Sequence, residues 1–259
     1  MIARDCVEAV TCRNAWLFRF IVFVVIGTVA QQAVFAQSAE AKVGTIEGTV
    51  SFVGEIPKST VADDAGVRHD LVEVDGRTRG LRYVVVYLTR TDGAKLSGER
   101  AASSSHSSDK LLMDQVDYAF RPRVLTVQEG ELVTFTNSDP ANHNVRTIAR
   151  NKTNKFNVFT GVDGKYEHRF GVEPEQRPIR LGCDIHPWMQ AWIYVFDHPF
   201  FAVTDATGQF RIPAVPTGKY GLHIVQPDIR HSEQRQVSIS EGETAKVDFV
   251  VRRDGTKQH

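Results

Sequence analysis

The chain has 259 residues, of which 42% are hydrophobic and 24% are charged, and its 31 basic and 31 acidic side chains give a formal net charge of zero. This length is sufficient for one or two domains with their own cores, and the composition is ordinary for a globular protein. The balanced charge excludes a strong electrostatic preference for nucleic acid, so we expect no nucleic-acid partner.

Residues 1–36 have the pattern of a secretory signal peptide. Three arginines precede an apolar run over residues 20–30, and a small-x-small cleavage site follows at Ala36. The run is shorter than the roughly 20 residues of a membrane span. An uncleaved N-terminal anchor is the alternative. We therefore expect an exported protein, periplasmic or extracellular, which contacts a membrane only if this segment is retained.

Cleavage would leave a single cysteine in the mature chain. Cys6 and Cys12 lie in the signal segment, and Cys183 is the third cysteine of the sequence. A lone thiol in an oxidising compartment is prone to oxidation unless something binds it. A metal bound at Cys183 would protect it.

After the signal segment, short runs rich in β-branched residues alternate with Gly, Pro, Asn and Asp, which predicts an all-β fold. We predict strands over residues 48–53 and 82–88, and the valine-rich second strand should be buried on both faces. Residues 92–111 lose this pattern and include a serine-rich stretch, so they are expected to form a linker.

The strand pattern resumes at residue 112. Strands over 124–127 and 133–135 should be joined at Gly130. Further strands are predicted over 156–159, 166–170, 179–181 and 191–196. From residue 198 onward, Asp-x-x-Gly and Pro-x-Gly turn signals recur at the spacing of hairpins.

The most specific pattern in the chain is Cys183-x-x-His186-x-x-Met189. A second imidazole, His143, should lie at the end of a strand, after the turn-forming Asp139-Pro140. Two His, one Cys and one Met form the ligand set of a blue-copper site, which serves electron transfer. We predict that His143, Cys183 and His186 bind one copper ion and that Met189 is the weak axial ligand.

These residues allow three other interpretations. Zinc could bind the same groups, but a Met ligand argues against it. A Cys-His protease lacks an evident third residue to orient its histidine. His198 could be an extra ligand, but it follows a strand that leads away from the Cys loop, and we expect it to be structural.

The two loop motifs resemble those of the cupredoxins, in particular the amicyanin and plastocyanin type. The resemblance covers about residues 112–197 and rests on Asn137-x-x-x-x-x-His143-Asn144-Val145 and Cys183-x-x-His186-Pro187-x-Met189. It implies a Greek-key β-sandwich that holds one copper ion.

Further roles follow from the same resemblance. Asn144 would tie the two loops together and orient the site, and Pro187 and Trp188 would form an apolar patch around His186 where redox partners dock. One departure concerns Leu181-Gly182, because cupredoxins often carry aromatic residues before the cysteine. The packing under the thiolate should therefore differ from that of the family.

The C-terminal stretch resembles a carboxypeptidase-regulatory-like, or prealbumin-like, β-sandwich. The resemblance rests on Thr204-Asp205-x-x-Gly208-x-Phe210, on Val215-Pro216-x-Gly218-x-Tyr220 and on Val247-Asp-Phe249. The opening strands of such a domain would lie before the copper region. We therefore predict a discontinuous sandwich of residues 43–91 and 198–252, with the cupredoxin domain, 112–197, inserted in it or adjacent to it.

These observations predict an exported mononuclear type 1 copper protein that carries single electrons between redox protein partners and is not an enzyme. One alternative is an extracytoplasmic module whose second sandwich contacts carbohydrate, a cell surface or another protein, with a structural metal. The other alternative is a copper carrier or store without redox turnover.

Overall fold

The structure is a computed structural model, and it describes residues 42–96 and 111–253. The predictions for the signal segment and for most of the linker fall outside these residues. In the described part of the chain, no helix is long and apolar enough to cross a membrane. All of these described residues belong to one compact unit.

The described residues form seventeen β-strands and two short 3-10 turns, so the predicted all-β fold class is confirmed. The first strands are β1 (Val43–Gly54) and β2 (Val85–Arg90). The middle of the chain contains β3 (Leu111–Val116), β4 (Ala119–Arg121), β5 (Val124–Gln128), β6 (Leu132–Asn137), β7 (His143–Ile148), η1 (Lys152–Asn154), β8 (Asn157–Thr160), β9 (Lys165–Arg169), η2 (Pro174–Gln176), β10 (Ile179–Gly182) and β11 (Gln190–Phe196). The last strands are β12 (Phe201–Val203), β13 (Gln209–Pro216), β14 (Gly218–Gln226), β15 (His231–Ile239), β16 (Thr244–Lys246) and β17 (Phe249–Arg253).

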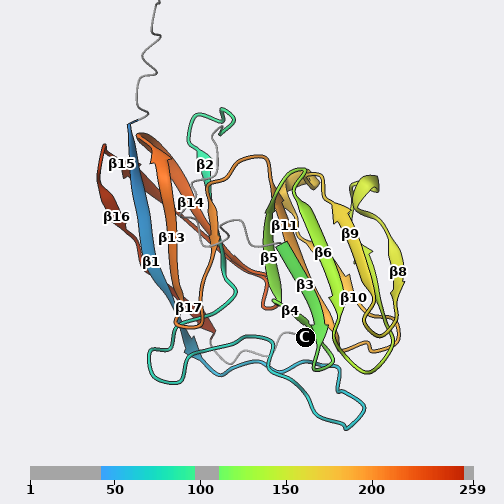
Figure 1. Cartoon of the computed structure of the whole chain (residues 1–259). Coiled ribbons are helices and arrows are strands. Elements are labelled where there is room, and N and C mark those ends of the chain that lie inside the picture. The colour runs from blue at the N-terminus through green and yellow to red at the C-terminus, as the bar shows by residue number, and fades with distance from the viewer. Residues whose placement is uncertain (1–41, 97–110, 254–259) are drawn as a thin grey trace, which may run out of the picture. The chain divides into compact units, whose positions relative to one another are not determined.

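One sandwich combines the first two strands with the last six. Its sheets have the orders β13-β1-β16, with β17 also paired to β1, and β12-β2-β14-β15. β1 runs antiparallel to β13 and parallel to β17, so in Figure 1 the blue strand lies among orange and red ones. The two sheets enclose one apolar cluster that contains Val50, Val86 and Phe249. β1 and β2 therefore complete a sandwich whose other strands come more than a hundred residues later.

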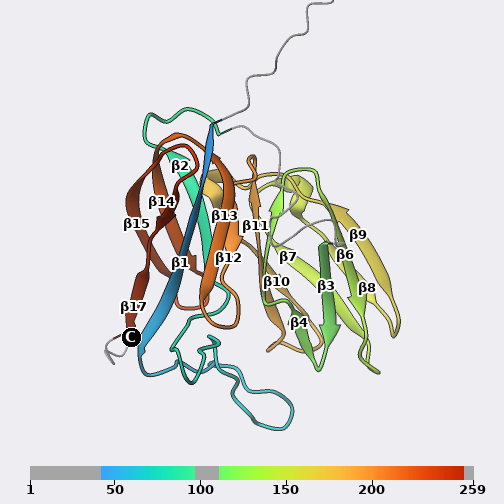
Figure 2. The ribbon, with the colours of Figure 1, turned by 60° about the vertical axis from the view of Figure 1, so that its left-hand side comes forward.

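The other sandwich consists only of strands β3 to β11. Its sheets have the orders β5-β11-β10-β7-β8 and β4-β3-β6-β9, and Figure 2 shows these strands grouped together in green, yellow and gold. Its core includes Met113, Phe135 and Ile179, all fully buried. We call this unit the β3–β11 sandwich and the first one the β1/β17 sandwich. That the two pieces of the β1/β17 sandwich form a separate folding domain stays a prediction.

Two details of the predicted arrangement are wrong. The turns at Gly208 and Gly218 are not hairpins, because β12, β13 and β14 alternate between the two sheets of their sandwich. Each turn carries the chain across the core so that the next strand can add its apolar face to the opposite sheet. In addition, β3 begins at Leu111, inside the predicted linker, and β17 extends to Arg253.

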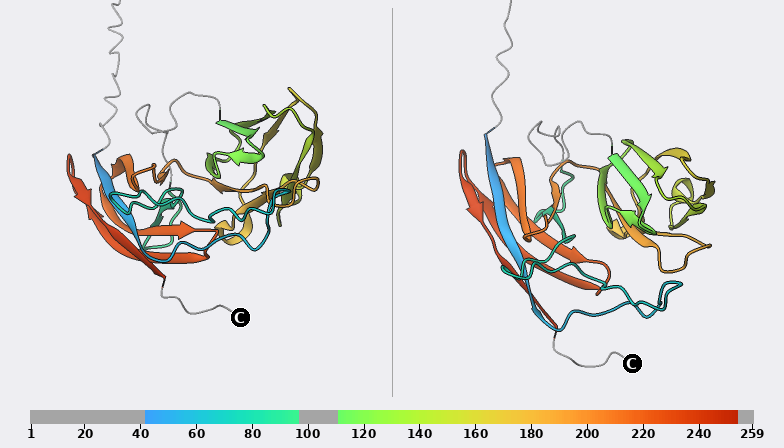
Figure 3. Two further views of the ribbon diagram at one scale, coloured as in Figure 1. Left: turned by 90° about the horizontal axis from the view of Figure 1, so that it is seen from below. Right: turned by 60° about the horizontal axis from the view of Figure 1, so that its bottom comes forward.

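Side chains of the two sandwiches meet directly. Val85 and Phe201 of the β1/β17 sandwich, with the adjoining Tyr83, share a buried cluster with Val124, Tyr194 and Phe196 of the β3–β11 sandwich. A long segment, residues 55–84, connects β1 to β2, and Figure 3 follows it in blue and blue-green. Within this connecting segment, Glu73 accepts a hydrogen bond from Arg121 of β4 at 3.1 Å.

Candidate metal centre

Two neighbouring strands bring the candidate ligands to one edge of the β3–β11 sandwich. β7 and β10 are antiparallel partners, so the beginning of β7 and the end of β10 lie at the same edge. His143 is the first residue of β7, at the end of that strand which follows the turn at Asp139 and Pro140. Cys183 immediately follows β10. The sheet register therefore places ligands from two loops next to each other.

The second loop is short and closed by its own backbone. The Met189 N–H donates to the His186 carbonyl at 2.9 Å, and the Cys183 N–H donates to the Met189 carbonyl at 3.3 Å. These bonds fold the loop back on itself before β11 begins. Cys183 and His186 consequently point toward the same space.

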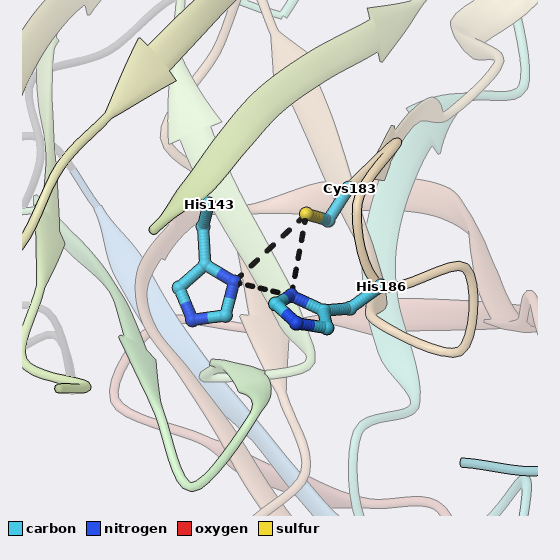
Figure 4. Close-up of side chains that lie close together, drawn as sticks. All are labelled: His143, Cys183 and His186. Atoms are coloured by element: carbon cyan, nitrogen blue, oxygen red, sulfur yellow. Dashed lines mark hydrogen bonds between the residues drawn. The ribbon is translucent and has the colours of Figure 1, made fainter. Parts of the chain in front are cut away.

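Three donor atoms converge in that space, as Figure 4 shows. His143 Nδ1 and His186 Nδ1 are 2.8 Å apart, and each lies 3.9 Å from Cys183 Sγ. All three side chains are buried. The centre of a triangle with these sides lies about 2.1 Å from each corner, which is the usual length of a metal–nitrogen bond. The spacing of the three donors therefore fits a small transition-metal ion.

Met189 lies where the loop ends and is 1% exposed. It belongs to the same apolar cluster as Cys183 in the core of the β3–β11 sandwich. A thioether among apolar side chains on the ligand loop can serve as the weak fourth donor of a copper site. The role of Met189 as axial ligand stays a prediction.

Asn144 connects the two ligand loops. Its Oδ1 accepts from the Asp184 N–H at 2.7 Å and from Cys183 Sγ at 3.4 Å, while its Nδ2 donates to Asp184 Oδ2 and to Asn157 Oδ1. Asp184 also pairs with Arg146 of β7 at 2.7 Å. These contacts hold the thiol loop against β7. That Asn144 orients a metal site stays a prediction.

Pro187 and Trp188 lie on the outer side of the ligand loop. Pro187 is exposed, and the half-buried Trp188 ring lies 5.1 Å from the His186 ring, centroid to centroid. Among the three candidate ligands His186 is the most exposed, at 9%. The expected docking of partners at Pro187 and Trp188 stays a prediction.

Tyr118 is a neighbour of the site that the sequence did not reveal. Its ring meets the His143 and His186 rings edge-on, with centroids 5.6 and 5.2 Å apart. Its carbonyl accepts a hydrogen bond from Trp188 Nε1 at 3.2 Å. Tyr118 lies in the turn between β3 and β4, and no spacing pattern connects that turn to the ligand loops.

Asp139 is a second neighbour of the site that the sequence motifs did not indicate. Its carboxylate Oδ2 lies 2.9 Å from His143 Nε2, on the side of the ring away from the donor cluster. The sequence pattern indicates only a turn at Asp139. An acidic residue four positions before a candidate ligand was the available signal.

The electrostatic environment favours neutral imidazole at the cluster. Burial, together with the neighbouring His143 ring, holds the pKa of His186 below its ordinary value, while the Asp64 and Asp139 carboxylates act in the opposite direction. Neutral imidazole is the form that binds metal. Asp64 belongs to the connecting segment 55–84, so this segment lies near enough to act on a candidate ligand.

The same connecting segment borders a cavity beside the site. The cavity has a volume of about 250 Å³ and is lined by His69 and Asp70 of this segment together with Tyr118, Trp188 and Met189. The connecting segment therefore lies beside the end of the ligand loop.

Gly182 occupies the position where the family often has an aromatic residue. A Cβ atom added at Gly182 would meet nothing within 4 Å. The absence of a side chain there is thus not required by a close backbone approach. At the position before Cys183, where an aromatic side chain was expected in the resembling proteins, there is open space beside Gly182.

His198 is not part of the donor cluster. It is 3% exposed, its Nδ1 accepts from the Phe200 N–H at 3.2 Å, and its ring lies 5.5 Å from that of Phe196. Its buried Nε2 has no hydrogen-bond partner among the described residues. These contacts agree with the structural role expected from the sequence.

The burial of His198 predicts a pH-dependent stability. Desolvation lowers the pKa of His198 to about 4, from 6.5 in the unfolded chain. Below pH 6.5 the unfolded chain therefore binds a proton that the folded chain excludes, and stability is lost as pH falls toward 4. We expect a loss of about 2 kcal/mol between pH 7 and pH 5.

The measurement is urea unfolding of the metal-free protein at both pH values. His198→Phe should reduce the loss between pH 7 and pH 5 by that amount, whereas His69→Gln, at an exposed histidine, should not. An equal pH dependence in wild type and His198→Phe would contradict the assignment.

Comparison with known proteins supports the carboxypeptidase-regulatory-like resemblance expected from the sequence. Residues 187–252 match the family model described as the carboxypeptidase regulatory-like domain. This match begins inside the candidate ligand loop, earlier than the predicted boundary at residue 198. A comparison with curated proteins finds no match.

Similar solved structures are cupredoxins and a copper enzyme. The Cu(I) form of an amicyanin mutant is 20% identical, with 42% of this chain and 99% of that chain covered and a TM-score of 0.29. The copper-containing nitrite reductase of Thermus scotoductus SA-01 is 21% identical, with 40% and 27% covered and a TM-score of 0.30. A purple cupredoxin from Nitrosopumilus maritimus is 23% identical, with 34% and 100% covered and a TM-score of 0.28. Such low scores do not identify a function.

The fold and the site together define the class: an all-β protein of two sandwiches with a candidate His-Cys-His metal centre at the edge of one of them.

Proposed function

We propose that this chain is an exported type 1 copper protein that binds one copper ion and carries single electrons between redox proteins. The observation that carries this proposal is the convergence of His143 Nδ1, Cys183 Sγ and His186 Nδ1 within 3.9 Å of one another. Two imidazoles and a thiolate with a nearby thioether suit both oxidation states of copper, and few other metals use this donor set.

The chain's own residues supply what an electron carrier needs. When bound, copper would supply the one-electron redox couple. The backbone bonds that close the ligand loop and the Asn144 bridge hold the donors in place, so little should move when the charge changes. Burial of the three donors excludes water from the site. Electrons would enter or leave through His186, beside Pro187 and Trp188.

The proposal does not include catalysis. The described residues contain one cluster of His and Cys side chains that could bind a metal. We infer that one such site is sufficient for an electron carrier. Export also belongs to the proposal and rests on the N-terminal pattern and on the single cysteine that cleavage would leave.

A visible absorption experiment tests the proposed function. The protein is loaded with Cu(II) and examined for an intense thiolate-to-copper band. We expect the band to disappear when ascorbate is added and to return on reoxidation. Absence of the band, or loss of copper on reduction, would overturn electron transfer and leave a structural or carried metal.

A second candidate function has one observation in its favour. The β1/β17 sandwich carries a groove of about 520 Å³, lined by charged side chains that include Glu47, Asp205, Arg211 and Lys246 and by the apolar Val203 and Phe210. Such a groove suits a hydroxyl-rich or charged partner, as in the alternative of a carbohydrate- or protein-binding module. Binding there and electron transfer at the metal are compatible, so the copper experiment decides only the latter.

Replacing the proposed axial ligand should change the reduction potential and leave copper bound. In Met189→Gln a hard amide oxygen replaces a soft thioether, which stabilises Cu(II) relative to Cu(I). We expect the potential to fall by at least about 59 mV, which corresponds to a tenfold change in relative affinity for one electron.

The potential is measured by a redox titration followed at the visible band. Met113→Leu is the matched control, because Met113 is buried in the same core. The control should keep the wild-type potential. If Met189→Gln also keeps it, Met189 is core packing and not an axial ligand.

A further inference from the structure

Asp139 is a buried carboxylate attached to a candidate ligand. It is 4% exposed, and its Oδ2 lies 2.9 Å from His143 Nε2 and accepts from the Tyr118 N–H at 3.0 Å. His143 itself is completely buried. The contact is on the opposite side of the imidazole from Nδ1, which faces Cys183 and His186.

The turn that carries Asp139 is fixed from within. Asn137, 1% exposed, accepts from the Asp139 N–H at 3.1 Å. The Asn137 side-chain NH₂ donates to the carbonyls of Ala141, Thr160 and Gly161 at 2.8 to 3.0 Å. The carboxylate is therefore held in position by the fold and does not depend on a metal for its placement.

Among the described residues, Asp139 forms no ion pair with a lysine or an arginine. Its ion pair in this part of the chain is with His143. A buried carboxylate is costly unless positive charge or strong hydrogen bonds compensate it. An imidazole bound to a metal cation provides both, because coordination makes its remaining N–H a stronger donor.

We propose that Asp139 is a positioning residue that prepares the site for Cu(II). Its carboxylate accepts a hydrogen bond from the Nε2–H of His143 and so keeps Nδ1 unprotonated and free to bind the metal. Its negative charge stabilises the more highly charged oxidation state and lowers the reduction potential. This role rests on the proposed copper function.

The same carboxylate also orders the outer side of the site. Through Oδ2 it holds the backbone of Tyr118, whose ring lies against both imidazoles and whose carbonyl accepts from Trp188. Asp139 thus connects the buried ligand His143 with the side chains around the more exposed ligand His186.

The first test uses metal-free wild-type protein and requires no variant. Nitrogen-15 NMR of the histidine rings distinguishes the two neutral tautomers. We expect His143 to carry its proton on Nε2. A proton on Nδ1 in the wild type would overturn the proposal whether or not the protein binds copper.

The second test compares the copper-loaded Asp139→Asn variant with wild type. Asparagine keeps the shape and an acceptor oxygen but removes the charge. We expect Cu(II) affinity to fall about 10- to 100-fold, and more than Cu(I) affinity. The potential should rise, by about 59 mV for each tenfold change in the ratio of the two affinities.

Asp163→Asn is the matched control, because Asp163 is an exposed aspartate in the same sandwich at a backbone position that asparagine tolerates (φ 58°). It should leave the potential and the Cu(II) affinity unchanged. An Asp139→Asn variant that folds and has the wild-type potential would overturn the proposal while the visible band upholds copper binding. If the wild-type protein shows no band, the proposed copper function is overturned. The tautomer of His143 in the metal-free protein would then still show whether Asp139 orients that ring.

Discussion

The Cys183→Ser variant is expected to lose the intense visible band of the copper-loaded protein completely. The band requires a covalent bond between a thiolate and Cu(II), and a hydroxyl is neither deprotonated as readily nor as soft a ligand. Cys183 is 3% exposed and lies 3.9 Å from both histidine donor atoms, so no other described thiol can replace it. The absorption spectrum after addition of one equivalent of Cu(II) is the measurement.

Two controls make this result specific. Serine is nearly isosteric, and its hydroxyl can still donate to Asn144 Oδ1, which lies 3.4 Å from the sulfur. The circular dichroism spectrum should therefore be that of wild type. A chain carrying Cys6→Ser and Cys12→Ser should keep the band. Retention of the band in Cys183→Ser would mean that copper binds elsewhere.

The candidate ligands could be predicted from the sequence because most of them belong to one short motif of residue types that bind copper. Cys183, His186 and Met189 share one loop, and the residue types alone restrict the metal. The prediction of His143 also depended on the fold, because this imidazole lies on a different loop that the fold has to bring next to Cys183. The β7–β10 pairing provides that proximity.

Asp139 and Tyr118 could not be predicted in the same way. The Asp-Pro pair describes a backbone turn, whereas the contact of Asp139 with His143 depends on how the imidazole is rotated. Tyr118 reaches the site from a different turn, and its contacts arise from sheet packing. Side-chain rotation and packing between distant turns leave no periodic signal in a sequence.

The same limit applied to the strand connections. Alternation of apolar and polar residues located most strands, since it reflects which face is buried. Whether the turns at Gly208 and Gly218 reverse the chain within one sheet depends on where the next strand finds its partner. The partner of β13 is β1, at the opposite end of the sequence. Local turn signals carry no information about that partner.

The contact between the two sandwiches gives a prediction about stability. Arg123 precedes β5 of the β3–β11 sandwich, and Asp228 lies in the turn after β14 of the β1/β17 sandwich. Arg123 donates to both oxygens of Asp228 at 2.7 Å, and Trp192 Nε1 donates to one of them at 2.9 Å. The Asp228 side chain is 3% exposed and that of Arg123 19% exposed. The ion pair is thus largely removed from water.

Replacing Arg123 by alanine should destabilise the protein by about 3 kcal/mol. The reason is that Asp228 would keep its negative charge in a buried position with only the Trp192 N–H among these three donors remaining. Free energies of unfolding from urea denaturation of metal-free wild type and variant give the measurement. The copper band of the variant should be unchanged below the unfolding transition, because the ligands lie on other loops.

A matched pair of variants separates the buried charge from the loss of an arginine. Arg177→Ala removes an arginine whose pair with Glu175 is more than half exposed, so the cost should stay below about 1 kcal/mol. Adding Asp228→Asn to Arg123→Ala removes the uncompensated charge while an acceptor for Trp192 remains, and should recover part of the lost stability. If Arg123→Ala costs no more than Arg177→Ala, the ion pair does not hold the two sandwiches together, and the buried cluster around Phe196 and Phe201 must provide that contact alone.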